Sequence, residues 1–186
     1  MLTQAEHDPE CAAFLITPSD RLADDVERCL QRQLDRLSRH ETIRQALDAH
    51  GAVVVTRSLA EAIELANLCA PEHLALLVRD PMAVLSRVRH AGAVILGHWT
   101  PQTAGDYLAG PSHVLPTGGT ARFWSPLNVD TFVKKTSFIG YDQNALQREA
   151  AAMAVLAEAE GFDAHAAAVN IRAGSQGRPH DMEGNP

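Results

Sequence analysis

The chain lacks several features that would define a function class at once. No apolar run is long enough to span a bilayer, and the start lacks the charged-then-apolar order of a signal peptide. It has no basic stripe either: Lys134-Lys135 is the longest basic cluster, and the net charge is -7. Its three cysteines are widely spaced and odd in number, which favours a reducing compartment over a disulfide framework. We therefore expect a soluble cytoplasmic protein without nucleic-acid or membrane partners.

What is present is an alternation of short apolar runs and amphipathic segments. Strands are predicted at 12–17, 52–56, 74–78 and 93–96. Helices are predicted between them, from Ser19 or Asp20 to about Leu37, and at 42–49, 58–69 and 81–89. Such alternation is typical of an α/β layer with a mainly parallel sheet, whose ligand site lies beyond the carboxyl ends of the strands.

The pattern changes after residue 127, so we predict three parts. Residues 1–127 form the α/β domain, which carries most of the candidate site. Residues 128–173 form a small helical unit, with a short segment near 131–139 and helices at 143–160 and 163–171. The remaining residues, 174–186, are polar and rich in Gly and Pro, and we expect them to be disordered.

The loop from Gly105 to Thr117 sets an acid, Asp106, and a histidine, His113, among glycines and prolines. Loops held by a rigid scaffold are where catalytic and binding groups concentrate. The tryptophans that flank the loop, Trp99 and Trp124, are expected to pack its base. Gly118-Gly119 suggests a phosphate nest, although a flexible turn is the better interpretation. No Gly-x-Gly-x-x-Gly fingerprint for a dinucleotide is present.

Two shorter strings are weaker signals when taken alone. Glu72-His73 sets an acid beside a base, but neighbours on a strand point to opposite faces unless the chain turns after Pro71. In Gln4-Ala5-Glu6-His7, one helical turn would place Gln4 and His7 on the same face. The alternatives are a surface Glu beside a hydrogen-bonded His, and two solvent-exposed side chains near the terminus.

Together these strings resemble the C-terminal half of the L-histidinol dehydrogenase family. The resemblance runs from about Gln4 to Arg172 and includes Ala70-Pro71-Glu72-His73-Leu74 and Glu160-Gly161-Phe162-Asp163-Ala164-His165. It implies a partial Rossmann-like sheet followed by the small helical unit. It also implies residue roles: Glu72 and His73 as catalytic bases, zinc ligands at Gln4, His7, Asp106 and His165, and substrate contacts from these four ligands together with His73, His113 and Glu160.

The implied activity is the NAD-dependent oxidation of L-histidinol through L-histidinal to L-histidine, with one zinc ion per subunit. The implied assembly is a homodimer in which the helical unit is exchanged between subunits. Most NAD contacts belong to the family's N-terminal half, which this sequence lacks, and residues 124–129 differ somewhat from the family pattern. One alternative is a non-catalytic metal-binding fragment or dimerisation module. Another is a divergent dehydrogenase for a different hydroxylated substrate, although His113 and Glu160 argue against it.

Overall fold

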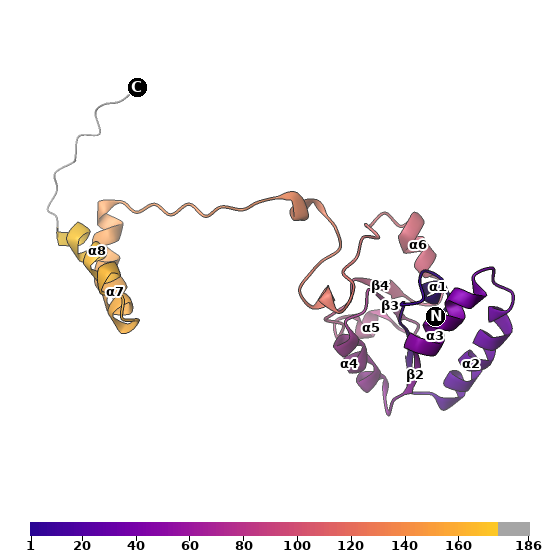
Figure 1. Ribbon diagram of the computed structural model, residues 1–186. Helices are drawn as coiled ribbons and strands as arrows, with labels where there is room; N and C mark the ends of the chain where they lie inside the picture. Colours follow the sequence, from indigo (N-terminus) through magenta and orange to yellow (C-terminus); the bar gives the residue numbers. More distant parts are fainter. Residues whose placement is uncertain (175–186) are drawn as a thin grey trace, which may run out of the picture. The chain divides into compact units, whose positions relative to one another are not determined.

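The computed structural model describes residues 1–174 and divides the chain into two compact units, Met1–Val133 and Lys134–Pro186 (Figure 1). We describe each unit by itself. None of the described helices combines the length and apolar character needed to cross a membrane. All three cysteines are free thiols, and Cys69 is exposed.

The first unit alternates strands with helices, as the sequence predicts. In chain order its elements are α1 (Leu2–Ala5), β1 (Ala13–Thr17), α2 (Asp20–Leu34), α3 (His40–His50), β2 (Gly51–Val55), α4 (Leu59–Cys69), β3 (His73–Leu76), α5 (Met82–Leu85), β4 (Ala93–Leu96), α6 (Gln102–Tyr107) and the 3-10 turns η1 (Thr120–Arg122) and η2 (Val129–Phe132).

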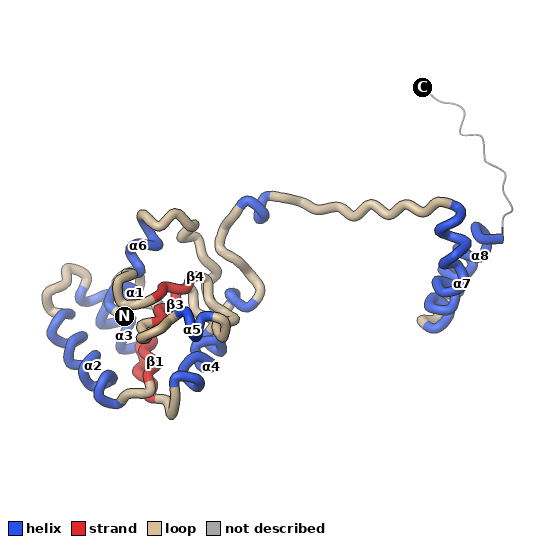
Figure 2. The backbone as a smooth tube through the Cα atoms, turned by 180° about the vertical axis from the view of Figure 1, so that it is seen from behind, coloured by secondary structure: helices blue, strands red, loops and turns tan. Residues whose placement is uncertain are grey.

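The strands pair in parallel, but in two separate pairs (Figure 2). In one pair β1 lies beside β2 with Ala13 opposite Gly51, and in the other β3 lies beside β4 with His73 opposite Ala93. The α/β class is therefore confirmed, whereas one continuous sheet is wrong for the described residues. Each strand has only four or five residues and hydrogen-bonds to a single neighbour, so neither pair extends into the other.

Side-chain caps determine where the two long helices of the α/β part begin. Ser19 accepts a hydrogen bond from the Leu22 amide at the start of α2, and Ser58 accepts one from the Glu61 amide at the start of α4. The Glu61 carboxylate in turn accepts hydrogen bonds from the backbone and side chain of Arg57. The Arg57 side-chain hydrogen bond lowers the pKa of the Glu61 carboxyl. Both predicted starts are confirmed.

The small core of this unit fixes the position of α1, which carries Gln4. Ala5, Leu34, Ile43 and Ala46 are buried together, and the partly buried Leu2, Leu37 and Leu47 pack against them. This four-residue helix thereby packs onto α2 and α3. A helix of four residues would not persist without such packing.

Two predictions about the second half of this unit are wrong. The helix expected over 81–89 covers only Met82–Leu85, because the buried amide of Asn67 holds the following segment. It donates to the Arg87 carbonyl and accepts from the amides of Arg89 and His90. The tryptophans do not pack a loop base: Trp99 is 98% exposed, and Trp124 lies on the surface against Phe123.

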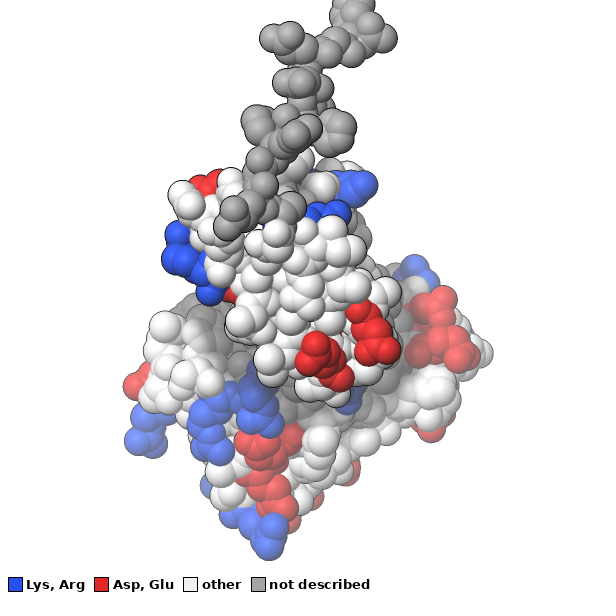
Figure 3. All heavy atoms as spheres, turned by 90° about the vertical axis from the view of Figure 1, so that its left-hand side faces the viewer, with Lys and Arg blue, Asp and Glu red and all other residues white. Residues whose placement is uncertain are grey.

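The second unit is an antiparallel pair of helices, α7 (Gln143–Ala159) and α8 (Asp163–Gly174), joined at Gly161, whose φ is +76°. Their contact is made by small side chains, since Ala150, Ala154 and Ala166 are buried. In Figure 3 the face of this helix pair that is turned to the viewer carries few charged side chains. Both predicted helices are confirmed. The predicted tail, 174–186, lies outside the described residues except for Gly174.

Candidate functional site

The first element of the candidate site is the bend at Glu72, just before β3. Because the chain bends there, the two neighbouring side chains approach each other: the His73 Nδ1 atom lies 3.8 Å from the Glu72 carboxylate. The His73 side chain is only 15% exposed and that of Glu72 is 30% exposed. The objection that strand neighbours point apart therefore does not apply. Nδ1 is buried and makes no hydrogen bond among the described residues.

The second element is α6, which carries Asp106. The His73 Nε2 atom lies 3.9 Å from the Asp106 carboxylate, so one imidazole stands between two carboxylates. We expected Asp106 in an irregular loop, but Gly105-Asp106-Tyr107 forms the last turn of a helix that begins after Pro101. The position of the cluster also differs from the prediction. His73 opens β3, so the cluster lies at the amino end of that strand and not beyond its carboxyl end.

The third element is α1, which carries Gln4. The Gln4 side-chain oxygen accepts a hydrogen bond from the Gln102 side chain on α6, at 3.2 Å. Both ribbon views place α1 beside α6 (Figures 1 and 2). His7 follows in the turn after α1, where its side chain is exposed and its carbonyl accepts from Arg39.

Close backbone packing supports the Glu72 bend. A Cβ atom on Gly92 would lie 2.6 Å from the Glu72 carbonyl oxygen and 3.1 Å from the Pro116 ring. Two hydrogen bonds run along the same contact, from the Gly92 amide to the Pro71 carbonyl at 2.9 Å and from the Ala93 amide to the Glu72 carbonyl at 2.8 Å. The buried Pro116 thus closes the candidate loop onto the Glu72-His73 dipeptide.

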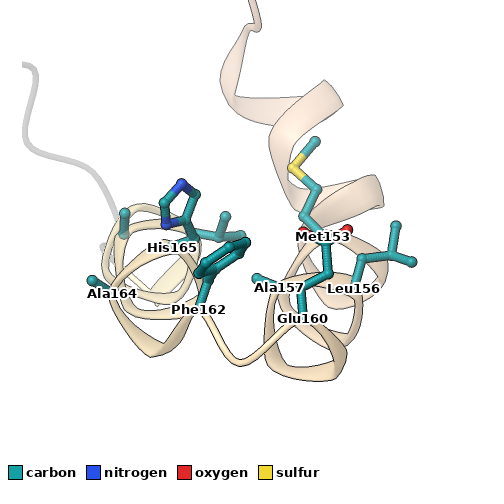
Figure 4. A pocket seen from close by; sticks show the side chains of 9 residues that line it. Met153, Leu156, Ala157, Glu160, Phe162, Ala164 and His165 are labelled. Carbon is teal, nitrogen blue, oxygen red and sulfur yellow. The ribbon is translucent and has the colours of Figure 1, made fainter.

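The remaining predicted residues lie in the loop of the first unit and in the helical unit. His113 is exposed in the loop of the first unit. Glu160 and His165 belong to the helical unit, where they flank a shallow apolar hollow between α7 and α8. Figure 4 shows Phe162 beside His165, with ring centroids 5.2 Å apart, and Met153 and Leu156 on the neighbouring helix.

The implied zinc ion can be tested against these donors. Two imidazoles, a carboxylate and an amide oxygen are nitrogen and oxygen donors that suit zinc. The hydrogen bond between α1 and α6 brings together the helices that carry Gln4 and Asp106. Within residues 1–174, however, no three His, Cys, Asp or Glu side chains gather closely enough to hold an ion. The donor chemistry fits zinc. Gln4, His7 and Asp106 belong to the first unit, and His165 belongs to the helical unit.

Sequence reasoning missed three residues that shape this region: Gly92, Asn67 and Gln102. Asn67 offered a signal, because it is a polar residue on the inward face of an otherwise apolar helix. Gly92 and Gln102 offered none that local patterns can reveal. Their contacts join positions 20 and 98 residues apart in the sequence.

The chain is similar in sequence to known proteins of one family. The family model described as histidinol dehydrogenase matches residues 1–173. The histidinol dehydrogenase of Heliobacterium mobile is 54% identical over 171 residues, which cover 92% of this chain and 40% of that protein. That of Bacillus cereus (strain ATCC 14579) is 50% identical over 172 residues, with the same two coverages.

A solved structure agrees. The crystal structure of histidinol dehydrogenase from Elizabethkingia anophelis matches with a TM-score of 0.82 and 34% identity over 94% of this chain and 40% of that one. The chain thus spans about two fifths of the length of the relatives it matches. From the family model, the identities and the fold, the chain belongs to the histidinol dehydrogenase family.

Proposed function

We propose that this chain is the part of a zinc- and NAD-dependent histidinol dehydrogenase that oxidises L-histidinol through L-histidinal to L-histidine. The observation that carries the proposal is the His73 imidazole between the carboxylates of Glu72 and Asp106, at 3.8 and 3.9 Å. Relatives at about half identity bear the same name, which supports the substrate.

The first oxidation removes a hydride from the alcohol carbon and a proton from its hydroxyl. We assign the proton to His73 Nε2, because this atom faces Asp106 while Nδ1 is buried beside Glu72. An imidazole accepts a proton readily near neutral pH.

The second oxidation adds water to the aldehyde and removes another hydride. Glu72 is suited to take the proton from that water, because its carboxylate is partly exposed while its backbone is held by the pairing with β4. Each oxidation sends its hydride to one NAD molecule. The dipeptide thus provides one base for each step, and the Glu72 side chain is more exposed to solvent than that of His73.

We assign zinc binding to Gln4, His7, Asp106 and His165. Bound zinc would supply a positive charge that orients the amino alcohol and polarises its oxygen without changing redox state. His113 and Glu160 would contact the substrate. His165 and Glu160 belong to the helical unit, so we propose a homodimer in which this unit is exchanged and a second copy completes the donor set.

The NAD contacts are assigned to the region of the relatives that this chain does not match. We also propose a cytoplasmic location, since three free thiols suit a reducing compartment. The α/β part is interpreted as a remnant of a Rossmann-like domain, spanning 1–127, and the exchanged unit as 128–173.

A second candidate is a non-catalytic metal-binding fragment or dimerisation module. It is favoured by large apolar side chains on the surface, such as Phe138, which is 94% exposed. Such surfaces need a partner to cover them.

The test is histidinol-dependent NADH formation, with zinc and NAD supplied, by the chain combined with the region of the relatives that it does not match. His73→Ala should lower turnover at least about 100-fold, the usual contribution of a positioned base, while zinc binding is kept. The matched control is His98→Ala, at an exposed histidine without an assigned role. Zinc binding without turnover in the wild-type chain would favour the second candidate. Equal turnover in the wild type and His73→Ala would refute the assigned role of His73.

A further inference from the structure

Gln102 is the residue through which α6 contacts α1. Its side-chain amide donates to the Gln4 side-chain oxygen at 3.2 Å, in a partly buried position and across 98 residues of sequence. Gln102 lies four residues before Asp106, so both side chains project from the same face of α6. One helix face therefore carries Asp106 and the side chain that contacts Gln4.

The two helices that this contact joins, α1 and α6, are both short. α1 has four residues and α6 has six, and neither helix has a side-chain cap. Helices of this length are unstable without tertiary contacts. The start of α6 is tied to the end of β4 by the Thr100 hydroxyl, which donates to the Leu96 carbonyl at 2.8 Å. The hydrogen bond from the Gln102 side chain connects α6 to α1.

The chemistry of an amide explains what the tie does. An amide oxygen has two lone pairs, so the Gln4 oxygen can accept from Gln102 and still bind a cation. An amide without a fixed partner presents oxygen or NH2 with little preference, and only the oxygen binds a metal. In the observed pair the Gln102 NH2 group donates to the Gln4 oxygen, so this oxygen faces the helix that carries Asp106.

We infer that Gln102 is a positioning residue that orients the side-chain oxygen of Gln4 for metal binding. The inference rests on the proposed function, because it takes Gln4 as a ligand. Gln102 does not bind the ion and acts through Gln4 alone. The hydrogen-bonding partners of metal ligands commonly contribute in this way.

The experiment is a titration of the metal-free full-length chain with Co²⁺, followed by the visible absorption of the bound ion. Gln102→Leu keeps the size of the side chain and removes the donor. It should weaken Co²⁺ binding about tenfold and shift the visible bands, as the loss of a ligand's partner does. Thr103→Val, on an exposed position of the same helix, should leave both unchanged. Circular dichroism of each variant verifies that the helices are kept.

A double variant separates positioning from general support of the fold. If Gln102 acts only through Gln4, the variant Gln4→Leu with Gln102→Leu binds Co²⁺ as weakly as Gln4→Leu and no weaker. Additive losses would overturn the inference, as would wild-type binding by Gln102→Leu while Gln4→Leu is impaired, and in both cases the proposed function stands. Wild-type binding by Gln4→Leu itself, or a wild-type chain that binds no Co²⁺, overturns the ligand assignment and the inference together.

Discussion

Gly92→Ala tests whether backbone packing sets the geometry of the Glu72-His73 dipeptide. The added Cβ would lie 2.6 Å from the Glu72 carbonyl oxygen, closer than such atoms approach each other in proteins. The Glu72 carbonyl cannot rotate away, because it accepts the Ala93 amide at 2.8 Å in the parallel pair. The second neighbour, the Pro116 ring at 3.1 Å, is buried and rigid. We therefore expect Glu72 and the first residues of β3 to move.

The magnitude follows from two opposing effects. Forcing extra atoms into a packed site costs about 1–3 kcal/mol. Replacing Gly by Ala also restricts the unfolded chain, which returns about 0.4–1 kcal/mol where the backbone allows Ala. The clash dominates, so the free energy of unfolding should fall by about 1–2 kcal/mol, or roughly 3–6 °C in Tm for a chain of this size.

The assay is thermal unfolding followed by circular dichroism, with Gly105→Ala as the matched control. Gly105 lies within α6 and has no atom within 4 Å of its built Cβ, so the same change there should raise stability by up to about 1 kcal/mol. Opposite signs from one chemical change would trace the effect to the contact with Glu72. A Gly92→Ala chain with a Tm at or above that of the wild type would refute the reasoning.

Two further predictions concern polar contacts that hold the scaffold. Asn67→Ala should lower the free energy of unfolding by about 2–4 kcal/mol in a urea titration, because Asn67 is 3% exposed and its loss strands the Arg89 and His90 amides. A loss below about 0.5 kcal/mol would contradict that account. The second prediction concerns pH. The Arg57 hydrogen bond lowers the pKa of the Glu61 carboxyl. The stabilisation of the fold by this hydrogen bond is therefore present above the ordinary carboxyl pKa and disappears as the pH falls through the lowered value. The wild type and Glu61→Gln should differ in urea midpoint at neutral pH and converge once the pH has fallen through the lowered pKa; a gap that persists at still lower pH would refute this origin.

Much of the fold could be predicted because local signals decide it. Ser19 and Ser58 begin their helices as capping residues do, and the four-residue strand Ala93–Leu96 falls where its apolar run predicts. The number of sheets could not be predicted in this way, because strand pairing depends on contacts between distant segments. α6 was missed for a local reason. Its Gly105 and the preceding Pro101 indicate a loop, and its apolar Tyr107 is exposed, so no buried face marks a helix.

Local sequence signals predict the candidate site less completely than they predict the fold. The residue types that carry chemistry could be found from the sequence, since an acid beside a histidine is visible in any chain. Their roles stay predictions, but the structure does bring Glu72, His73 and Asp106 together. Gly92, which packs against Glu72, and Gln102, which contacts Gln4, carry no acid or base that would mark them in the sequence.

The reason lies in the elements that carry the site. α1, β3 and α6 have four, four and six residues, too few for propensity or amphipathic packing to fix them independently. Each is held by a contact with a remote segment. For α1 the contact is with the apolar core, and for α6 it is the hydrogen bond between the Gln102 and Gln4 amides. For β3 it is the close approach of Gly92, which has no Cβ, to Glu72. Substitutions at these contacts should therefore change the geometry of the site before they unfold the chain, which is the behaviour expected of positioning residues.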